Sequence, residues 1–211
     1  MIGSDEGEGE WWDIVMDSGL AHLKYCLHDH IDAPFLSAFV ERWQPDTNSF
    51  NFYWGDMTVT LHDVWSILGL QIDGDCIELD EKSAKQTAEQ QKSEFADFLN
   101  VNPDDMLQWM GRGSIKFKDL QNIGEELEEP ERRATAYLLY LICSTIFLDK
   151  TVDRAHHKYF PLLRDVSRIS NYAWGAGALA YLYRRLGEAT RAGCKQFCGS
   201  ATLLQVQCIY A

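Results

Sequence analysis

The 211-residue chain lacks the features that would assign it to several large protein classes. Its N-terminus has no basic segment followed by an apolar run, which argues against a secretory signal. The longest apolar run, from Ala134 to Leu148, is interrupted by Thr135, Ser144 and Thr145. It is shorter than the ~20 residues of a membrane-spanning helix and is typical of a central buried helix. We therefore expect no membrane contact.

Metal-binding and disulfide patterns are also scarce. Six cysteines are present, but none form a Cys-x-x-Cys pair. Cys194 and Cys198 are four residues apart, and His28 and His30 are two residues apart. For neither pair can the further ligands that a metal site needs be assigned from the sequence. We predict reduced thiols in an intracellular compartment, no metal and no cofactor; a zinc half-site at the cysteines and a shared metal at the histidines remain alternatives.

Recognisable catalytic motifs are missing as well. The chain contains no G-x-S-x-G, S-x-x-K or H-E-x-x-H sequence. The segment Gly111-Arg112-Gly113 follows a predicted helix and not a strand, so it is a weak candidate for a phosphate loop. Acidic pairs such as Asp104-Asp105 are typical of the first turn of a helix or of a solvent-exposed acidic segment. No catalytic set can be assembled, and we predict that the chain is not an enzyme.

Positive charge is short overall but unevenly distributed. The chain has 19 Lys and Arg against 32 Asp and Glu, a net charge of −13. From Arg132 to Ala211 there are 11 basic and 4 acidic residues, a net of +7, so residues 1–131 carry −20. This asymmetry predicts either two solvated faces that attract each other or a basic binding surface.

The hydrophobic content of 46% and the seven Trp are sufficient for a large core. Helical periodicity dominates, and one alternating segment near residues 50–59 predicts a small β-hairpin. After it, Thr60 and Asp63 form a capping-box pattern, and Gly69 is placed to end the helix. We expect Val64, Trp65, Ile67 and Leu68 on its buried face. The fold class is therefore mainly α, as a single compact helical domain.

Another predicted helix, from Tyr172 to Leu186, carries Trp174 on its apolar side and several small residues. Glycine in a helix interior costs about 1 kcal/mol relative to Ala. We expect a close contact with another helix to offset that cost at Gly175 and Gly177. We expect residues 1–16 to be an acidic tail and lead-in, and residues 17–211 to be the domain, with its last helix cut short at the chain end. Within the domain, we expect Glu78 to Lys92 to be a mobile loop or a frayed helix.

Several long segments resemble the plant mobile domain, also called the aminotransferase-like plant mobile domain. They are Val40-Glu-Arg-Trp-Gln-Pro-Asp-Thr-Asn-Ser-Phe50, Trp54-Gly-Asp-Met-Thr-Val-Thr-Leu-His-Asp-Val64, Leu68-Gly-Leu-Gln-Ile-Asp-Gly74, the run from Leu162 to Leu186, Ala189-Thr-Arg-Ala-Gly193 and Thr202-Leu-Leu-Gln205. The resemblance is strongest to the Maintenance-of-Meristems-like members. One departure is that Gln207-Cys208 stands where the family usually has a Trp.

The resemblance implies a helical nuclear protein that acts in transposon silencing, gene expression and genome maintenance in meristems, with a phosphatase-7-like partner. It supplies no catalytic residues. Our first hypothesis is a protein-interaction module; the alternatives are DNA binding through a basic C-terminal surface and a transposon-derived enzyme remnant. The candidate partner-binding residues are Arg164, Arg168, Arg184, Arg185 and Arg191. An Arg–carboxylate network around Arg164, Asp165 and Arg168 is a further expectation.

Overall fold

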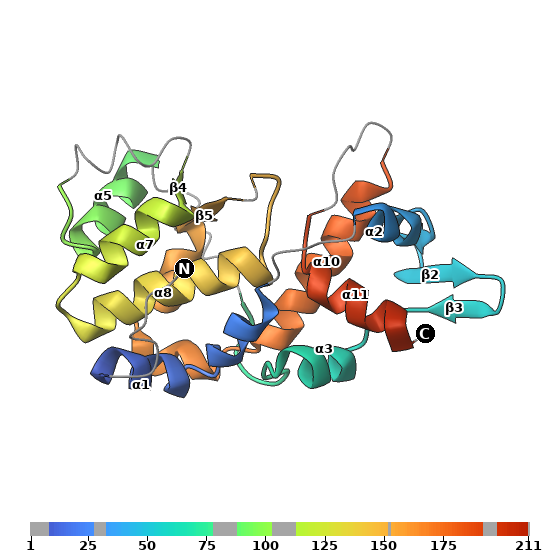
Figure 1. Cartoon of the computed structure of the whole chain (residues 1–211), viewed down its shortest axis with the longest axis horizontal. Helices are drawn as coiled ribbons and strands as arrows, with labels where there is room; N and C mark the ends of the chain where they lie inside the picture. Colours follow the sequence, from blue (N-terminus) through green and yellow to red (C-terminus); the bar gives the residue numbers. More distant parts are fainter. Residues whose placement is uncertain are drawn as a thin grey trace. The chain divides into compact units, whose positions relative to one another are not determined.

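The computed structural model describes residues 9–27, 33–77, 88–102, 113–151, 153–191 and 198–210, without the side chains of residues 33, 88, 91, 92 and 206–210. Helices dominate, and the predicted hairpin is present, so the expected mainly α fold is confirmed (Figure 1). No helix within these ranges is both long and apolar enough to cross a bilayer. The chain forms two compact units, each assembled from segments that are distant in sequence.

Unit 1 comprises Met1–Ala21, Ile77–Ser144 and Asp153–Asn171. Its elements are α1 (Glu10–Asp17), α5 (Ala88–Phe98), β4 (Ser114–Lys116), α7 (Phe117–Glu126), α8 (Pro130–Thr145), β5 (Arg154–His156), η2 (His157–Tyr159), α9 (Phe160–Leu163) and η3 (Val166–Asn171). Strands β4 and β5 pair antiparallel, with Ile115 opposite Ala155. This second sheet joins segments almost 40 residues apart and was not expected from the local pattern.

Helix α8 is the buried helix that the apolar run predicted, although it begins earlier, at Pro130. Leu138, Leu139 and Ile142 are fully buried. The lead-in also belongs to this core, because Trp11 and Trp12 of α1 pack edge-on against the Tyr137 ring, at centroid distances of 5.6 and 5.9 Å. Residues 10–16 are therefore part of the folded unit.

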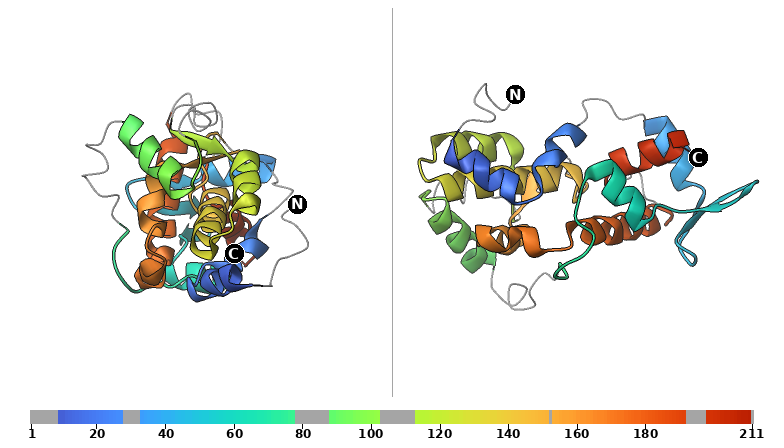
Figure 2. Two further views of the ribbon diagram at one scale, coloured as in Figure 1. Left: turned by 90° about the vertical axis from the view of Figure 1, so that its left-hand side faces the viewer. Right: turned by 90° about the horizontal axis from the view of Figure 1, so that it is seen from below.

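Unit 2 comprises His22–Cys76, Thr145–Val152 and Tyr172–Ala211. Its elements are η1 (Ala21–Cys26, whose first residue is counted with unit 1), α2 (Ala33–Val40), β1 (Trp43–Gln44), β2 (Ser49–Phe52), β3 (Gly55–Met57), α3 (Leu61–Leu68), α10 (Trp174–Ala189) and α11 (Ala201–Tyr210). The three strands form one antiparallel sheet in the order β1-β2-β3. Figure 2 shows the β2–β3 hairpin extending away from the helices of this unit.

Helix α3 has the predicted ends. The Thr60 side chain accepts a hydrogen bond from the Asp63 backbone N–H, and Asp63 accepts one from the Thr60 backbone, which completes the capping box. Gly69 closes the helix in the left-handed conformation, with φ of 65°. The predicted buried face is only partly correct: Val64 and Leu68 are buried, but Trp65 is 55% exposed.

Helix α10 is central to unit 2, as its small residues predicted. Trp174 is 2% exposed and packs edge-on against the Tyr172 ring. Helix α10 packs against helix α3, and at Gly175 it also approaches an extended segment, because the Gly175 N–H donates to the Gln71 carbonyl at 2.7 Å. A Cβ on Gly175 would lie 2.9 Å from the Ile72 side chain, so only glycine fits without rearrangement.

Candidate functional site

The five candidate arginines are divided between the two units. Arg164 and Arg168 are exposed residues of unit 1, at the end of α9 and in η3. Between them, the Asp165 carboxylate accepts hydrogen bonds from the Ser167 backbone N–H and hydroxyl, and the expected Arg–carboxylate network stays a prediction. Asp165 thus closes a local turn.

An Arg–carboxylate network lies on α10, in unit 2. Arg185 donates to the Glu188 carboxylate at 2.7 Å and to the Tyr181 hydroxyl at 2.7 Å, and Arg184 donates to the other Glu188 oxygen at 3.1 Å. Tyr181 in turn donates to the Leu148 carbonyl at 3.1 Å. Arg185 therefore ties α10 to the segment that follows α8.

This network sets the charge states of its members. The hydrogen bond from Arg185 lowers the pKa of the Glu188 carboxyl, so this group is a carboxylate at neutral pH. Burial raises the pKa of the Tyr181 hydroxyl, which stays protonated and can donate. The Arg185 side chain is 16% exposed, against 74% for Arg184. Arg184 and Arg191 are therefore accessible to a partner, and Arg185 is held mainly within the unit.

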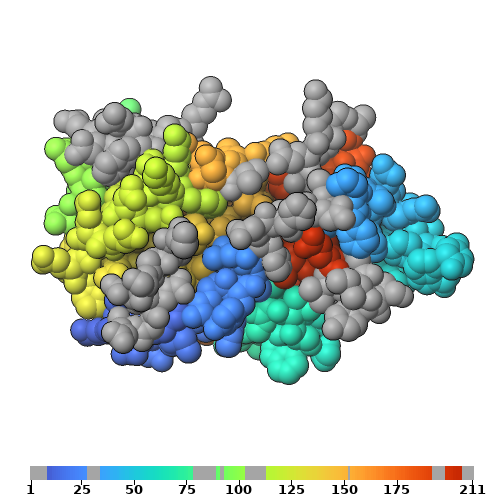
Figure 3. Space-filling model, in the orientation of Figure 1, coloured from blue at the N-terminus to red at the C-terminus, as the bar shows by residue number. Residues whose placement is uncertain are grey.

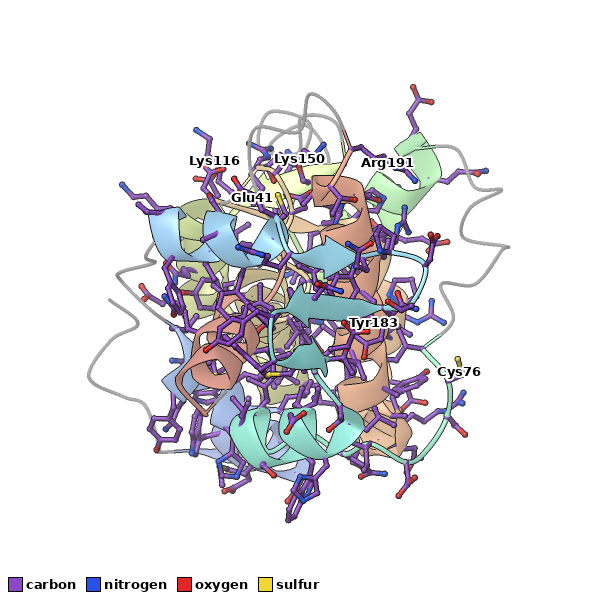
Figure 4. All side chains as sticks on the ribbon, turned by 90° about the vertical axis from the view of Figure 1, so that its right-hand side faces the viewer. Glu41, Cys76, Lys116, Lys150, Tyr183 and Arg191 are labelled. Atoms are coloured by element: carbon purple, nitrogen blue, oxygen red, sulfur yellow. The ribbon has the colours of Figure 1, made fainter. Side chains whose placement is uncertain are left out.

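Arg184 and Arg191 both line an open pocket of about 680 Å³ in unit 2. One wall is the face of α10 and the residues just beyond it, and the other is the turn between β1 and β2. The complete lining is Pro45, Asn48, Ala180, Tyr183, Arg184, Gly187, Glu188, Thr190 and Arg191. Figure 4 labels Tyr183 and Arg191, with Arg191 nearer the top of the view.

Tyr183 fixes the two walls of this pocket to each other. Its hydroxyl donates to the Val59 carbonyl at 2.6 Å and lies 2.9 Å from the Thr58 hydroxyl oxygen. Thr58 donates in turn to the Asn48 carbonyl at 2.6 Å. The Tyr183 ring also packs on Trp43 of β1, with the centroids 5.3 Å apart. No local pattern singles out Tyr183 or Asn48, because they are linked through Thr58 only in the folded chain.

A second feature of unit 2 is a set of large apolar side chains that face solvent. Tyr53 and Trp54, at the tip of the β2–β3 hairpin, are 95% and 54% exposed, and Leu61 and Trp65 of α3 are also exposed. Trp54 lies parallel on Phe52, with centroids 4.8 Å apart. Figure 3 shows the hairpin with no other segment covering it in that view. The Trp54 ring is therefore stacked on one face but half exposed.

Among the residues that the structure describes, no group of three or more His, Cys, Asp or Glu could hold a metal ion. His28, His30 and Cys194 lie outside the described residues, as do Asp104 and Asp105, so the metal alternatives and the acidic-pair interpretation stay predictions. The side chains of Gln207 and Cys208 are likewise not described. The four described cysteines, Cys26, Cys76, Cys143 and Cys198, form no disulfide with one another, and the reduced state of the thiols stays a prediction.

Comparison with known proteins identifies the family. Residues 19–209 match the plant mobile domain. The chain is 37% identical to Protein MAIN-LIKE 2 of Arabidopsis thaliana over 215 residues, which cover 96% of this chain and 31% of that protein. It is 34% identical to Protein MAINTENANCE OF MERISTEMS of the same organism, covering 91% and 40% of the two chains.

A more distant relative is the Arabidopsis thaliana serine/threonine-protein phosphatase 7 long form homolog, 28% identical over 196 residues, which cover 91% of this chain and 14% of that protein. No solved structure matches the chain. The chain spans between about a third and two fifths of the length of the MAIN-type relatives. The chain belongs to the plant mobile domain family.

Proposed function

We propose that this chain is a non-catalytic protein-interaction module that acts in the nucleus. On this proposal it contributes to transposon silencing, gene expression and genome maintenance in meristems, and its partner is a phosphatase-7-like protein. The names of the relatives support this reading, since one is called MAINTENANCE OF MERISTEMS and another is a phosphatase 7 homolog.

The observation that carries the proposal is the exposed aromatic tip of the β2–β3 hairpin. Two-residue hairpin loops normally use Asn, Asp or Gly, because these residues accept the tight backbone. Here the two tip positions are Tyr53 and Trp54, and Tyr53 is 95% exposed. Residues that break a local structural preference are expected at functional sites. Tyr and Trp are also the residue types that dominate binding energy in protein interfaces.

The surroundings of the tip are suited to a partner surface. Stacking on Phe52 holds the Trp54 ring in place, so little side-chain freedom remains to be lost on binding. Leu61 and Trp65 add a second apolar pair on α3, four residues apart and therefore on one face of the helix. At the tip itself the Tyr53 and Trp54 rings are in edge contact, with centroids 4.4 Å apart, and contiguous exposed apolar surface marks protein-binding sites.

A direct binding titration tests the proposal. The whole chain and a purified phosphatase-7-like protein are titrated by isothermal calorimetry, with wild type compared with Tyr53→Ser. We expect the substitution to weaken binding roughly tenfold or more and to leave the unfolding midpoint unchanged, since the ring makes so little contact within the chain. The matched control is Tyr25→Ser, which removes a ring that is 73% exposed on η1. No binding by wild type, or equal losses in the two variants, would refute the proposed surface.

DNA binding is the second candidate function, favoured by the net charge of +7 on residues 132–211. One observation weakens it: the Arg185 side chain is only 16% exposed and is bonded to Glu188 and Tyr181. The chain as a whole carries −13, which opposes non-specific attraction to phosphate. The interpretation as an enzyme remnant stays a hypothesis, because no feature of the site favours a reaction.

A further inference from the structure

We infer that the arginine-lined pocket of unit 2 binds an acidic side chain of a partner protein, carrying a carboxylate or a phosphate, through Arg184 and Arg191. The inference deepens the proposed function and rests on it for the origin of the ligand. The pocket and the hairpin tip are separate features, so each can be tested without the other.

The two guanidinium groups can reach the same pocket. Arg184 lies on α10 and Arg191 two residues beyond its end, and both line the same cavity. Helix α10 ends at Ala189, and the Arg191 backbone N–H still donates to the Glu188 carbonyl, which keeps this residue close to the helix end. Both side chains are exposed.

The Arg191 guanidinium is available for a ligand. Within the described part of the chain it forms no ion pair and no side-chain hydrogen bond. Arg184 binds Glu188 through Nε only, which leaves its two terminal nitrogens for another acceptor. Guanidinium groups bind carboxylates and phosphates through paired N–H groups, and a shared site for two of them favours an anion strongly.

The local charge has the matching sign. Glu188 is the only acidic residue of the lining, and its two oxygens already accept bonds from Arg184 and Arg185. The lining holds two arginines and one carboxylate, a balance of +1. Asp46, in the turn beside Pro45, reduces this charge but does not line the cavity. The C-terminal carbonyls of α10 also attract these arginines, so a bound anion competes with a weak existing interaction.

The size of the pocket indicates what carries the anion. About 680 Å³ is much larger than one carboxylate or phosphate group. The lining also offers neutral polar groups at Asn48 and Thr190 and the apolar surface of Pro45 and Ala180. This combination suits an acidic residue with part of its flanking peptide. It is a poor fit for a free ion, which would leave most of the cavity unfilled.

Peptide titrations with the whole chain test the inference. Three peptides share the sequence Gly-Ser-X-Gly-Ser, with phosphoserine, glutamate or serine at X, and binding is followed by backbone amide shifts of the ¹⁵N-labelled protein. We expect the phosphoserine or the glutamate peptide, or both, to shift the amides of pocket residues, and the serine peptide to shift none. The stronger of the two acidic peptides identifies the source of the anion.

The decisive variant is Arg191→Gln, with Arg164→Gln as the matched control, since Arg164 is an exposed arginine of unit 1. We expect Arg191→Gln to weaken acidic-peptide binding roughly tenfold and Arg164→Gln to leave it unchanged. Equal shifts with the serine peptide, equal binding by Arg191→Gln, or pocket shifts caused only by a DNA duplex would overturn the inference.

The failure of this inference can be distinguished from failure of the proposed function. If the wild-type chain binds a phosphatase-7-like protein but no acidic peptide, the anion pocket is wrong and the interaction module stands. If acidic peptides bind in an Arg191-dependent way while the phosphatase-7-like protein does not bind, the pocket stands and the proposed partner is wrong.

Discussion

Two glycines of α10 should respond in opposite ways to the same substitution. Alanine is favoured over glycine in a helix by up to about 1 kcal/mol, so Gly→Ala stabilises wherever the added Cβ meets no obstacle. At Gly187 nothing lies within 4 Å of the added Cβ. We therefore expect Gly187→Ala to raise the free energy of unfolding by about 0.5 kcal/mol, since this site is near the helix end, where propensity counts less.

At Gly175 the added Cβ would lie 2.9 Å from Ile72 Cγ2 and 3.0 Å from the Gln71 carbonyl oxygen. The carbonyl belongs to the backbone and accepts the 2.7 Å bond from the Gly175 N–H, so relief of the clash lengthens that bond. Overpacking of this kind costs about 1–3 kcal/mol, which exceeds the gain in helix propensity. We expect Gly175→Ala to lower the free energy of unfolding by about 1–2 kcal/mol.

Urea unfolding, followed by far-UV circular dichroism for wild type and both variants, measures these changes. The comparison is internally controlled, because both substitutions add one methyl group to the same helix. A Gly175→Ala variant as stable as wild type would show that α10 does not approach the Leu70–Ile72 segment this closely. If Gly187→Ala were the more destabilising of the two, the reasoning from Cβ clearance would be refuted.

Three further perturbations have defined outcomes. Trp174→Ala should destabilise by about 3–5 kcal/mol in urea unfolding, because the ring is almost fully buried; a loss under about 1 kcal/mol would contradict that burial. Thr60→Ala should cost about 1 kcal/mol by removing the side chain that caps the Asp63 N–H, and an unchanged midpoint would refute the capping role. The pKa of the Glu188 carboxyl is lower in the folded state than in the unfolded state, so its ionised form stabilises the fold at pH values above the ordinary carboxyl pKa. This stabilisation is lost as the pH falls through the folded-state pKa. Wild type should therefore lose more stability than Glu188→Gln on acidification from about pH 5 to pH 3; parallel profiles would show that the bond from Arg185 is not important in solution.

Local chemistry made some parts of the fold predictable. The capping box at Thr60 and the left-handed Gly69 follow from backbone requirements that act within a few residues, and both were correctly placed. The apolar run predicted the buried helix α8 for the same kind of reason. In contrast, the pairing of Ile115 with Ala155 depends on chain topology, which leaves no trace in either short strand.

The candidate site was less predictable, because accessibility is a tertiary property. Helical spacing places Trp65 beside Leu68 on α3, but it does not show how much of that helix face the rest of the chain covers. Leu68 is buried, whereas the Trp65 ring lies outside the covered part of the face. Composition placed the five arginines in one basic region, but the fold assigns them to two units and ties Arg185 to Glu188. The predicted non-catalytic function and nuclear location do not follow from the fold, and both stay predictions.

The central claim is that this domain binds a protein and not DNA, and a paired titration of the wild-type chain tests it most directly. Purified phosphatase-7-like protein and a DNA duplex are titrated in parallel at about 50 and 200 mM salt, since phosphate-mediated binding falls steeply over this range. We predict binding of the protein partner at both salt concentrations, with a change in affinity of less than about tenfold, and weak DNA binding that disappears at the higher one. Tight, salt-sensitive binding of DNA together with no binding of the protein partner would contradict the account.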